Sequence, residues 1–341
     1  MAYRITLEPS GHTYSASPDQ TLLQAALDAG LTIPYGCRNG ACGACKSKVI
    51  EGNVDNENAP PHVLTTEDLA AGLTLTCCAR PLSDVTVEVR EVVTQDDIPL
   101  RTMPARVQEL RRVADDVIVM KLKLPANERL QFIAGQYIEF LLADGKRRAF
   151  SLANAPDQDD LLELHLRLIP GGTFTELVFS KMKERDILRF EGPLGSFRLH
   201  EDSDRPVIML AGGTGFAPIK ALVEHALHQR ITRPMAIYWG ARNRGGLYLP
   251  ELPQQWAAAH PHIRYTPVLS EPDAADAWTG RTGLVHQAVL EDIADLSPYQ
   301  VYACGAPVMV EAALRDFTAR GLPADQFFAD IFSYAAKTER K

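Results

Sequence analysis

The stretch GCRNGACGAC, residues 36–45, carries three cysteines in a C-x4-C-x2-C spacing, and a fourth cysteine follows in LTCC, residues 75–78. This spacing is typical of a plant-type [2Fe–2S] cluster, which four thiolates hold. Glycines between the ligands allow positive φ values and bring backbone N–H groups close to the cluster sulfurs. The pattern therefore predicts such a cluster near the N-terminus. The predicted ligands are Cys37, Cys42, Cys45 and Cys77.

Two other uses of these cysteines agree less well with the spacing. Structural zinc sites often combine two C-x2-C pairs, whereas only Cys42 and Cys45 form such a pair here. Disulfides are disfavoured because no secretory signal opens the chain and cytosolic thiols remain reduced. Cys78 adjoins Cys77, and we predict that it is not a ligand because consecutive strand residues point to opposite faces.

The composition indicates a multidomain globular protein. The 341 residues are enough for two or three domains, and 46% of them are hydrophobic. The formal net charge is −8 and no basic run occurs, so no nucleic-acid partner is expected. No stretch approaches the roughly 18 apolar residues of a membrane span. We therefore expect a cytoplasmic protein without a membrane span.

Residues 1–93 have the pattern of a small α+β domain. Tyr3, Ile5 and Leu7 alternate with polar residues, as in a half-buried strand, and the alternation recurs at residues 85–89. Ser17 is predicted to cap the first helix, which would begin at Pro18. The polar residues 94–103 lack periodicity and are predicted to form a linker.

Residues 104–202 are predicted to form a small antiparallel barrel. The segment from Leu162 to Leu168 alternates leucine with polar residues, as expected of a strand with one buried face. Glycine and proline separate several such short segments, and one helix lies among them. This succession of short strands is typical of antiparallel barrels.

Residues 203–341 are predicted to form an α/β domain with a mostly parallel sheet. The run VIMLA, residues 207–211, is continuously apolar, as in a strand that is buried on both faces. Helix-like and strand-like segments alternate after it, which is the pattern of a parallel sheet covered by helices.

Two glycine loops are candidates for phosphate binding. AGGTGFAP, residues 211–218, directly follows the buried run, and a diphosphate would fit the N–H groups of the helix that follows. It is not the G-x-G-x-x-G fingerprint, because Pro218 occupies the place of the third glycine. PGGTFTE, residues 170–176, is the second loop, and Arg148 would supply a paired charge to a phosphate there. The alternatives are tight strand-to-helix turns and a solvated arginine.

Together with SLANAP (151–156), YWG (238–240) and WTG (278–280), these motifs resemble NADH-dependent iron–sulfur flavoprotein reductases of the ferredoxin–NADP reductase superfamily. The resemblance covers essentially the whole chain. It implies a β-grasp, ferredoxin-like domain with a [2Fe–2S] cluster, an antiparallel β-barrel domain that binds FAD, and an α/β domain that binds the nicotinamide nucleotide.

The resemblance also implies roles for residues around the flavin. The family's R-x-Y-S motif falls on Arg148, Phe150 and Ser151, so that Arg148 would hold the FAD diphosphate and Ser151 would lie near flavin N5. Phe150 replaces the usual tyrosine; its ring can pack on the flavin, but the phenolic hydrogen bond is lost. The second diphosphate-binding loop falls on Gly171, Gly172, Thr173 and Thr175.

For the nicotinamide nucleotide, the resemblance points to two motifs in the last domain. The C-G-x-P motif begins at Cys304 and Gly305, and its cysteine would lie beside the nicotinamide, although a buried apolar role is the commoner fate of a cysteine. Ser151 and Cys304 are therefore the candidate catalytic residues. Phe332 would either cover the flavin face or pack in the core. The predicted nucleotide loop comprises Gly212, Gly213, Thr214 and Gly215.

By resemblance, hydride passes from NADH to FAD, and single electrons then pass through the cluster to a separate acceptor protein docked near the cysteine loop. That acceptor would be a deoxysugar dehydratase or a ring-hydroxylating or other oxygenase. NADPH is the alternative electron donor, because arginine at position 242 or 244 would accept its 2′-phosphate. The residues concerned are Arg242 and Arg244. A redox-sensing module and a self-contained flavoenzyme are the other functions considered; no further acid–base constellation supports the latter.

Overall fold

The computed structural model of the chain describes residues 2–89, 93–94 and 98–332. The chain divides into two compact units. Of the described residues, the first unit comprises 2–89, 93–94, 98–99, 195–197 and 330–332, and the second comprises 100–194 and 198–329. The division after Pro99 falls inside the predicted linker, and the last residues of that linker, Arg101–Met103, already belong to a strand.

The first unit contains a five-stranded sheet in the order β2-β1-β8-β4-β6. The strand β1 pairs in parallel with β8, whereas β1 with β2, β4 with β8 and β4 with β6 pair antiparallel. Two small ladders, β3 with β9 and β5 with β7, complete the unit. The elements are β1 (Tyr3–Glu8), β2 (His12–Ala16), α1 (Leu22–Asp28), β3 (Leu31–Thr32), β4 (Lys46–Glu51), β5 (Val54–Asp55), α2 (Thr66–Ala70), β6 (Leu73–Leu75), β7 (Arg80–Pro81), β8 (Val85–Glu88) and β9 (Val93–Thr94).

The first helix begins later than predicted. Its N-cap is Thr21, whose side chain accepts a hydrogen bond from Gln24 N at 3.1 Å. Ser17 instead closes a turn, because its backbone N–H donates to the Gln20 side chain at 3.0 Å. The predicted cap at Ser17 is therefore wrong.

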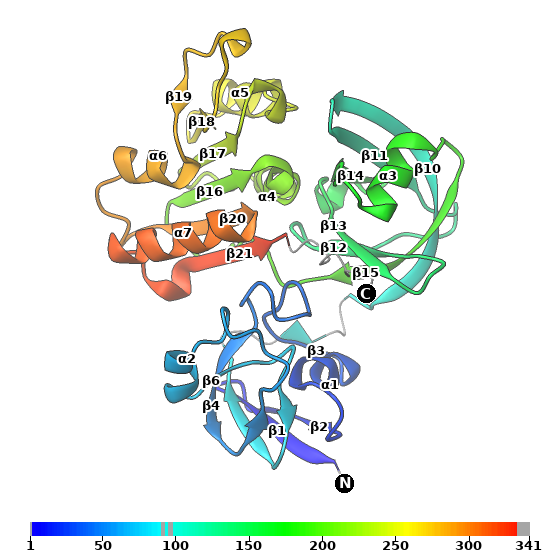
Figure 1. The fold of residues 1–341 in the computed structure, drawn as a ribbon, viewed down its shortest axis with the longest axis vertical. Helices are drawn as coiled ribbons and strands as arrows, with labels where there is room; N and C mark the ends of the chain where they lie inside the picture. The colour runs from blue at the N-terminus through cyan, green and yellow to red at the C-terminus, as the bar shows by residue number, and fades with distance from the viewer. Residues whose placement is uncertain (1, 90–92, 95–97, 333–341) are drawn as a thin grey trace. The chain divides into compact units, whose positions relative to one another are not determined.

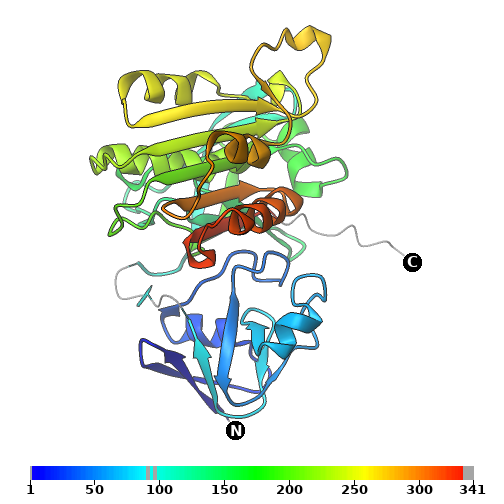
Figure 2. The same ribbon diagram turned by 90° about the vertical axis from the view of Figure 1, so that its left-hand side faces the viewer.

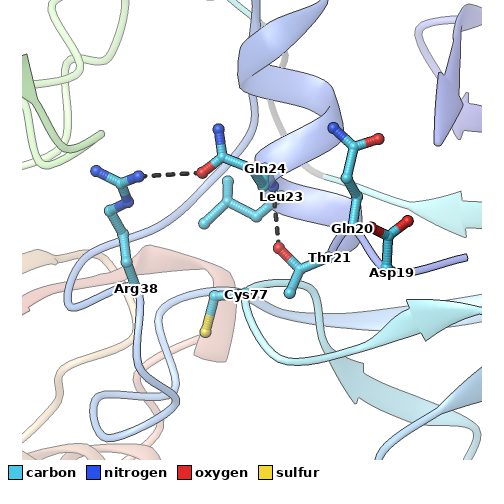
Figure 3. Close-up of a pocket in the computed structure, with 7 residues that line it drawn as sticks. All are labelled: Asp19, Gln20, Thr21, Leu23, Gln24, Arg38 and Cys77. Atoms are coloured by element: carbon cyan, nitrogen blue, oxygen red, sulfur yellow. Dashed lines mark hydrogen bonds between the residues drawn. The ribbon is translucent and has the colours of Figure 1, made fainter. Parts of the chain in front are cut away.

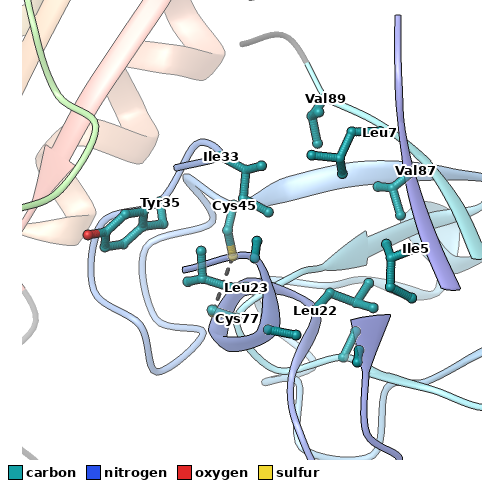
Figure 4. Close-up of a cluster of buried hydrophobic side chains, with 14 of the residues drawn as sticks. Ile5, Leu7, Leu22, Leu23, Ile33, Tyr35, Cys45, Cys77, Val87 and Val89 are labelled. Carbon is teal, nitrogen blue, oxygen red and sulfur yellow. Dashed lines mark hydrogen bonds between the residues drawn. The ribbon is translucent and has the colours of Figure 1, made fainter. Parts of the chain in front are cut away.

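The core of the first unit packs α1 against the sheet (Figure 4). Leu22 and Leu23 lie against strand residues such as Ile5 and Val87, and all four are almost fully buried. Each such side chain stabilises the fold by about 1.5–3 kcal/mol relative to an exposed one. Cys45 and Cys77 belong to the same buried cluster, so the cysteine loop is anchored in this core.

The second unit begins with a six-stranded antiparallel sheet in the order β13-β12-β15-β10-β11-β14. A bridge between Leu152 and Leu164 joins its two edges, which closes the sheet into a barrel around Phe140 and Phe190. The predicted antiparallel barrel is confirmed. Its elements are β10 (Arg101–Ala114), β11 (Val117–Lys123), β12 (Tyr137–Leu141), β13 (Arg147–Ser151), β14 (Leu162–Arg167), α3 (Thr173–Ser180) and β15 (Ile187–Leu194).

The rest of the second unit is a sheet in the order β19-β18-β17-β16-β20-β21, with parallel pairing at β16–β17, β16–β20 and β17–β18. Helices α4 and α5 cover one face and α6 and α7 the other (Figures 1 and 2), as right-handed crossovers on either side of β16 require. The strands are β16 (Val207–Gly212), β17 (Met235–Ala241), β18 (Ile263–Leu269), β19 (Arg281–Thr282), β20 (Gln300–Gly305) and β21 (Phe327–Ile331). The helices are α4 (Phe216–His228), α5 (Glu251–Ala259), α6 (Val285–Asp292) and α7 (Pro307–Ala319).

This topology confirms the predicted α/β domain and shows where its ligand site belongs. The chain leaves β16 toward β17 on one side and returns to β20 on the other, so the strand order reverses between β16 and β20. In open parallel sheets, ligands bind at the carboxyl ends of the strands beside such a reversal. Among the described residues, no helix is long and apolar enough to cross a membrane.

Candidate functional site

The four predicted cluster ligands lie in two pairs. The backbone N–H of Cys37 donates to Cys42 Sγ at 3.4 Å, and that of Cys42 donates to Cys37 Sγ at 3.3 Å. Cys45 Sγ lies 3.2 Å from Cys77 Sγ. Within the described part of the chain, no three or more His, Cys, Asp or Glu side chains are arranged to hold a single metal ion. Two pairs of thiolates suit a binuclear cluster, in which each iron takes two protein ligands.

The electrostatics of each pair stabilise one thiolate, which is the form that binds metal. The hydrogen bond with Cys42 lowers the pKa of the Cys37 thiol to about 6, and backbone N–H groups of the loop act in the same direction. The same hydrogen bond and burial raise the pKa of Cys42. In the second pair, the shared hydrogen bond lowers the pKa of Cys45 and raises that of Cys77.

Close packing of the loop explains its glycines. Gly40 has φ +81°, and a β-carbon there would lie 2.7 Å from both Cys78 Sγ and Pro60 Cδ. A β-carbon at Gly36 would lie 3.2 Å from Cys42 Sγ. Side chains at either position would push the sulfurs outward, so glycine keeps the thiols together.

Our reason for setting Cys78 aside is wrong. Cys77 and Cys78 lie in a turn after β6 and not in a strand, and both are buried, with their sulfurs 3.7 Å apart. Strand alternation therefore does not separate them. What distinguishes Cys77 is its contact with Cys45, whereas Cys78 faces the space beside Gly40.

A pocket of about 320 Å³ opens beside Cys77 (Figure 3). The side chain of Arg38 donates to Gln24 Oε1 at 3.1 Å, which ties the cysteine loop to α1. A predicted cluster ligand thus borders a hollow lined by charged and amide groups. The lining residues are Asp19, Gln20, Thr21, Leu23, Gln24, Arg38 and Cys77.

In the second unit, the predicted flavin motif lies on β13 at one edge of the barrel sheet. Arg148 is half-buried, and its guanidinium donates to the carbonyl of Arg147 at 2.8 Å. Phe150 packs against Phe140 and Phe174, with ring centroids 5.8 and 5.5 Å away. Ser151 is buried at the end of the strand. The ring of Phe150 is therefore held by barrel aromatics.

The predicted second phosphate loop turns directly into α3. The helix begins at Thr173 with Gly172 as its N-cap and no side-chain cap. A β-carbon on Gly172 would lie 2.8 Å from Thr175 Oγ1, so the backbone and this hydroxyl pack tightly. Gly171 N donates to the Glu176 carboxylate at 2.7 Å. The loop presents the uncapped start of a helix, a geometry that suits phosphate.

The structure brings the predicted nucleotide loop and the C-G-x-P motif together. Ala211 pairs with Cys304 across β16 and β20. A β-carbon on Gly215 would lie 2.1 Å from Cys304 O, and one on Gly305 would lie 3.1 Å from Gly212 O. Gly213 adopts φ +54°. The buried Cys304, one residue before the end of β20, thus lies directly against the loop that contains Gly212–Gly215.

Sequence reasoning missed Arg167, which ends β14 in the barrel. Its guanidinium lies 3.4 Å from the position that a β-carbon on Gly213 would take, and it forms an ion pair with Asp116. A cation from the barrel therefore faces the nucleotide loop. In the sequence, Arg167 stands just before the glycine loop of residues 170–176, which could have drawn attention to it. Only the fold shows that its side chain reaches the other glycine loop, at Gly213.

Two further predicted residues lie just beyond the ends of strands β16 and β21. Thr214 is buried in the short helix Gly213–Gly215. Phe332 follows β21 and is half-buried. That Phe332 covers the flavin stays a prediction.

Comparison with known proteins agrees with the three parts of the site. Residues 5–82 match the 2Fe-2S iron-sulfur cluster binding domain family. Residues 104–199 match the oxidoreductase FAD-binding domain, and residues 209–315 match the oxidoreductase NAD-binding domain. Each match falls within one of the three domains predicted from the sequence.

Relatives of known role match the whole chain. It is 42% identical over 332 residues to the CDP-6-deoxy-L-threo-D-glycero-4-hexulose-3-dehydrase reductase of Yersinia pseudotuberculosis serotype I (strain IP32953), covering 97% of this chain and 99% of the relative. The chain belongs to the iron–sulfur flavoprotein reductases. It is also 35% identical to terephthalate 1,2-dioxygenase, reductase component 1, of Comamonas sp, with 98% of both chains covered. The crystal structure of the Amycolatopsis cytochrome P450 reductase GcoB matches 98% of this reductase and 100% of that chain, at 35% identity and a TM-score of 0.79.

This reductase is an electron-transfer oxidoreductase that uses a nicotinamide nucleotide, FAD and a [2Fe–2S] cluster. The residues present fit these groups. Paired thiols match a binuclear cluster, and the uncapped helix start at Gly172 suits a phosphate. The glycine loop at the carboxyl end of β16, where Gly215 approaches Cys304, suits a nucleotide.

The first prediction separates the two adjacent cysteines. Cys77→Ser removes one sulfur of a predicted ligand pair, so we expect loss of most bound iron and acid-labile sulfide. Cys78→Ser leaves both pairs intact and should retain them. Iron and sulfide analysis of anaerobically purified protein, with electron paramagnetic resonance after reduction, measures both. Equal loss in the two variants would show that Cys78 also holds the cluster.

The second prediction concerns the close approach at Gly215. Gly215→Ala places a methyl group against Cys304 O and must displace the loop, so the dissociation constant of NAD should rise by about tenfold or more. Calorimetric titration of the oxidised protein measures it. Gly145→Ala is the control for backbone strain away from the nucleotide loop, because Gly145 has φ +77° but a β-carbon there meets nothing within 4 Å. An unchanged affinity in Gly215→Ala contradicts the assignment of this loop to the nucleotide.

Proposed function

We propose that this reductase supplies electrons to a CDP-6-deoxyhexulose 3-dehydrase, as CDP-6-deoxy-3,4-glucoseen reductase does. The observation that carries the proposal is the 42% identity to the Yersinia dehydrase reductase over 97% of the chain. The identity to a second such relative, from Yersinia pestis, is also 42%.

The second candidate acceptor is an oxygenase component. Terephthalate dioxygenase and phenol monooxygenase reductase components are 35% and 34% identical to this chain, and the similar structure of GcoB belongs to a cytochrome P450 reductase. Identity is lower than to the dehydrase reductases, so we rank this acceptor second.

We divide the chain into three domains and a linker. Residues 1–93 hold the cluster, residues 104–202 bind FAD and residues 203–341 bind the nucleotide. Residues 94–103 link the cluster domain to the FAD domain. When bound, FAD takes up two electrons as hydride and releases them singly to the cluster.

Arg148 and the loop of Gly171, Gly172, Thr173 and Thr175 would bind the FAD diphosphate. Ser151 and Cys304 would flank the reacting atoms, and Phe150 and Phe332 would pack on the flavin. Gly212, Gly213, Thr214, Gly215 and Gly305 would receive the nucleotide, with Arg167 beside its phosphates.

We favour NADH over NADPH. The guanidinium of Arg244 donates to the carbonyl of Asp276 at 3.2 Å, and the Asp276 carboxylate accepts from the Arg244 backbone. A carboxylate at this place would repel a 2′-phosphate, which supports the nucleotide without one. We also propose a cytoplasmic location, because the four predicted cluster thiols must stay reduced to bind iron and cytosolic thiols are kept reduced.

We further propose that the acceptor docks at the pocket beside Cys77. Electron transfer favours a short path from the cluster, and this pocket brings a predicted ligand close to the surface of the first unit. Arg38 and Asp19 give it charges of both signs for recognition.

The third prediction tests the acceptor. With NADH, we expect turnover with the Yersinia dehydrase and its CDP-hexulose substrate to exceed that with the terephthalate dioxygenase component by about tenfold or more. NADPH should support both reactions less well. Product formation under air-free conditions for the dehydrase, and oxygen uptake for the dioxygenase, measure the two rates. A reversed order would make this protein an oxygenase reductase, and NADH-dependent ferricyanide reduction is the control for an intact enzyme.

The fourth prediction tests the docking site. Asp19→Arg places a long cation at the exposed rim of the pocket and should slow electron transfer to the dehydrase by about fivefold or more. Ferricyanide reduction should stay unchanged, because a small ion needs no docking surface. The matched control is Glu51→Arg, since Glu51 ends β4, about 16 Å along the strand from Lys46 beside the cysteine loop. Equal slowing by both substitutions would argue for overall charge and against a defined docking site.

A further inference from the structure

A buried lysine lies between the barrel and the α/β domain of the second unit. Lys220 on α4 is only 7% exposed. Its ammonium group can donate three hydrogen bonds, and three acceptors surround it. Nζ lies 3.0 Å from Ala153 O, 2.9 Å from Glu224 Oε2 and 3.2 Å from Glu163 Oε1. Lys220 therefore joins its own helix to β14 and to the segment that follows the flavin strand β13.

The contacts continue from Glu163 into the barrel. His165 Nε2 lies 3.0 Å from Glu163 Oε1, and His165 Nδ1 lies 2.8 Å from the Tyr248 hydroxyl. Burial opposes ionisation of Glu163, but the His165 hydrogen bond and the Lys220 charge outweigh it and lower its pKa to about 2. Burial lowers the pKa of His165 and raises that of Tyr248. The neutral imidazole thus donates to Glu163 through Nε2 and accepts from Tyr248 at Nδ1.

Aromatic contacts carry the same network to the nucleotide loop. The ring of Tyr248 meets that of Trp239 edge-on, with centroids 5.1 Å apart. Trp239 stacks on Phe216 at 3.9 Å, and its indole N–H donates to Gly213 O at 2.9 Å. Packed and hydrogen-bonded groups therefore run without a break from Ala153, beside the flavin strand, to Gly213 in the nucleotide loop.

Stability alone does not account for this arrangement. Taking a lysine and two carboxylates out of water carries a large desolvation cost, and well-packed apolar groups of similar volume often stabilise a fold equally well. Apolar contacts, unlike hydrogen bonds, do not depend on the orientation of the groups that meet. Three acceptors around one ammonium fix the distance between α4 and the segment at Ala153, whereas leucine or methionine contacts would let them slide.

We propose that Lys220 is a positioning residue, which holds the segment after the flavin strand and the helix behind the nucleotide loop at a fixed separation. The inference rests on the proposed roles of Ser151 and of Gly212–Gly215. Hydride transfer depends steeply on the distance and alignment of the reacting atoms, and a misplacement of about 1 Å can cost about 100-fold in rate. Lys220 would act on the rate of this step and not on how tightly either cofactor binds.

The test compares the holoenzyme with Lys220→Met, which keeps an unbranched side chain one atom shorter but removes the charge and all three hydrogen bonds. In stopped-flow experiments, we expect flavin reduction at saturating NADH to slow by about 10- to 100-fold. Flavin content should stay normal, and the calorimetric dissociation constant of NAD should change by less than about threefold. Amide hydrogen exchange should become faster at residues 153–155 and 213–216. Lys121→Met is the matched control, because it removes a lysine from an ion pair with Glu109 at the barrel surface.

A second variant guards against failure of Lys220→Met to fold. Tyr248→Phe removes one hydroxyl midway along the network, between His165 and Trp239, and should slow flavin reduction in the same direction by a smaller factor. Unchanged reduction rates in the folded variants overturn the proposal. So does a loss that lies wholly in flavin content or NAD affinity, because that result identifies a merely structural role. If the wild-type flavin is not reduced by NADH at all, the proposed function fails instead.

Discussion

At the carboxyl ends of β16 and β20, the two main chains approach so closely that no side chain fits between them. A β-carbon on Gly215 would lie 2.1 Å from Cys304 O, and one on Gly305 would lie 3.1 Å from Gly212 O. The parallel register of Ala211 with Cys304 sets this approach, and the reversal of strand order places it where α/β sheets bind ligands. Two motifs that lie far apart in the sequence thus form one wall of the predicted nucleotide site. Glycine is required there by backbone contact, independently of any ligand.

The parts of the fold that could be predicted from the sequence are those with a local pattern. Alternation at Tyr3–Leu7, the apolar run 207–211 and the cysteine spacing each report on a few neighbouring residues, and the structure forms the corresponding strands and thiol pairs. The start of α1 could not be predicted in this way. The backbone N–H of Leu22 donates to Ala79 O, so a distant turn supplies partners for the first turn of the helix. Ser17 and Thr21 are comparable caps locally, and this long-range contact selects Thr21.

Burial and long-range contact also explain what sequence reasoning missed at the sites. LTCC reads as a strand, but the chain turns at Cys77 and Cys78, and both thiols face inward. Of the three acceptors of Lys220, only Glu224 is visible in the sequence, as its i+4 neighbour on the helix. Glu163 and Ala153 reach it through tertiary structure, and no periodicity connects them. Arg167 reaches Gly213 for the same reason.

The cysteine loop and the contact between the barrel and the nucleotide loop are held in place by different kinds of interaction. Around the thiols, the constraint is steric, since a β-carbon at Gly36 or Gly40 would meet a cysteine sulfur and since Cys45 and Cys77 are anchored in the apolar core. Between the barrel and the nucleotide loop, the constraint is directional and polar. A pair of surfaces that must hold two cofactors in register gains little from more apolar area, because apolar contact is indifferent to small sliding. A buried ammonium group that donates three hydrogen bonds resists any movement that would lengthen one of them. This resistance is a reason for a protein to bury a charge despite the desolvation cost.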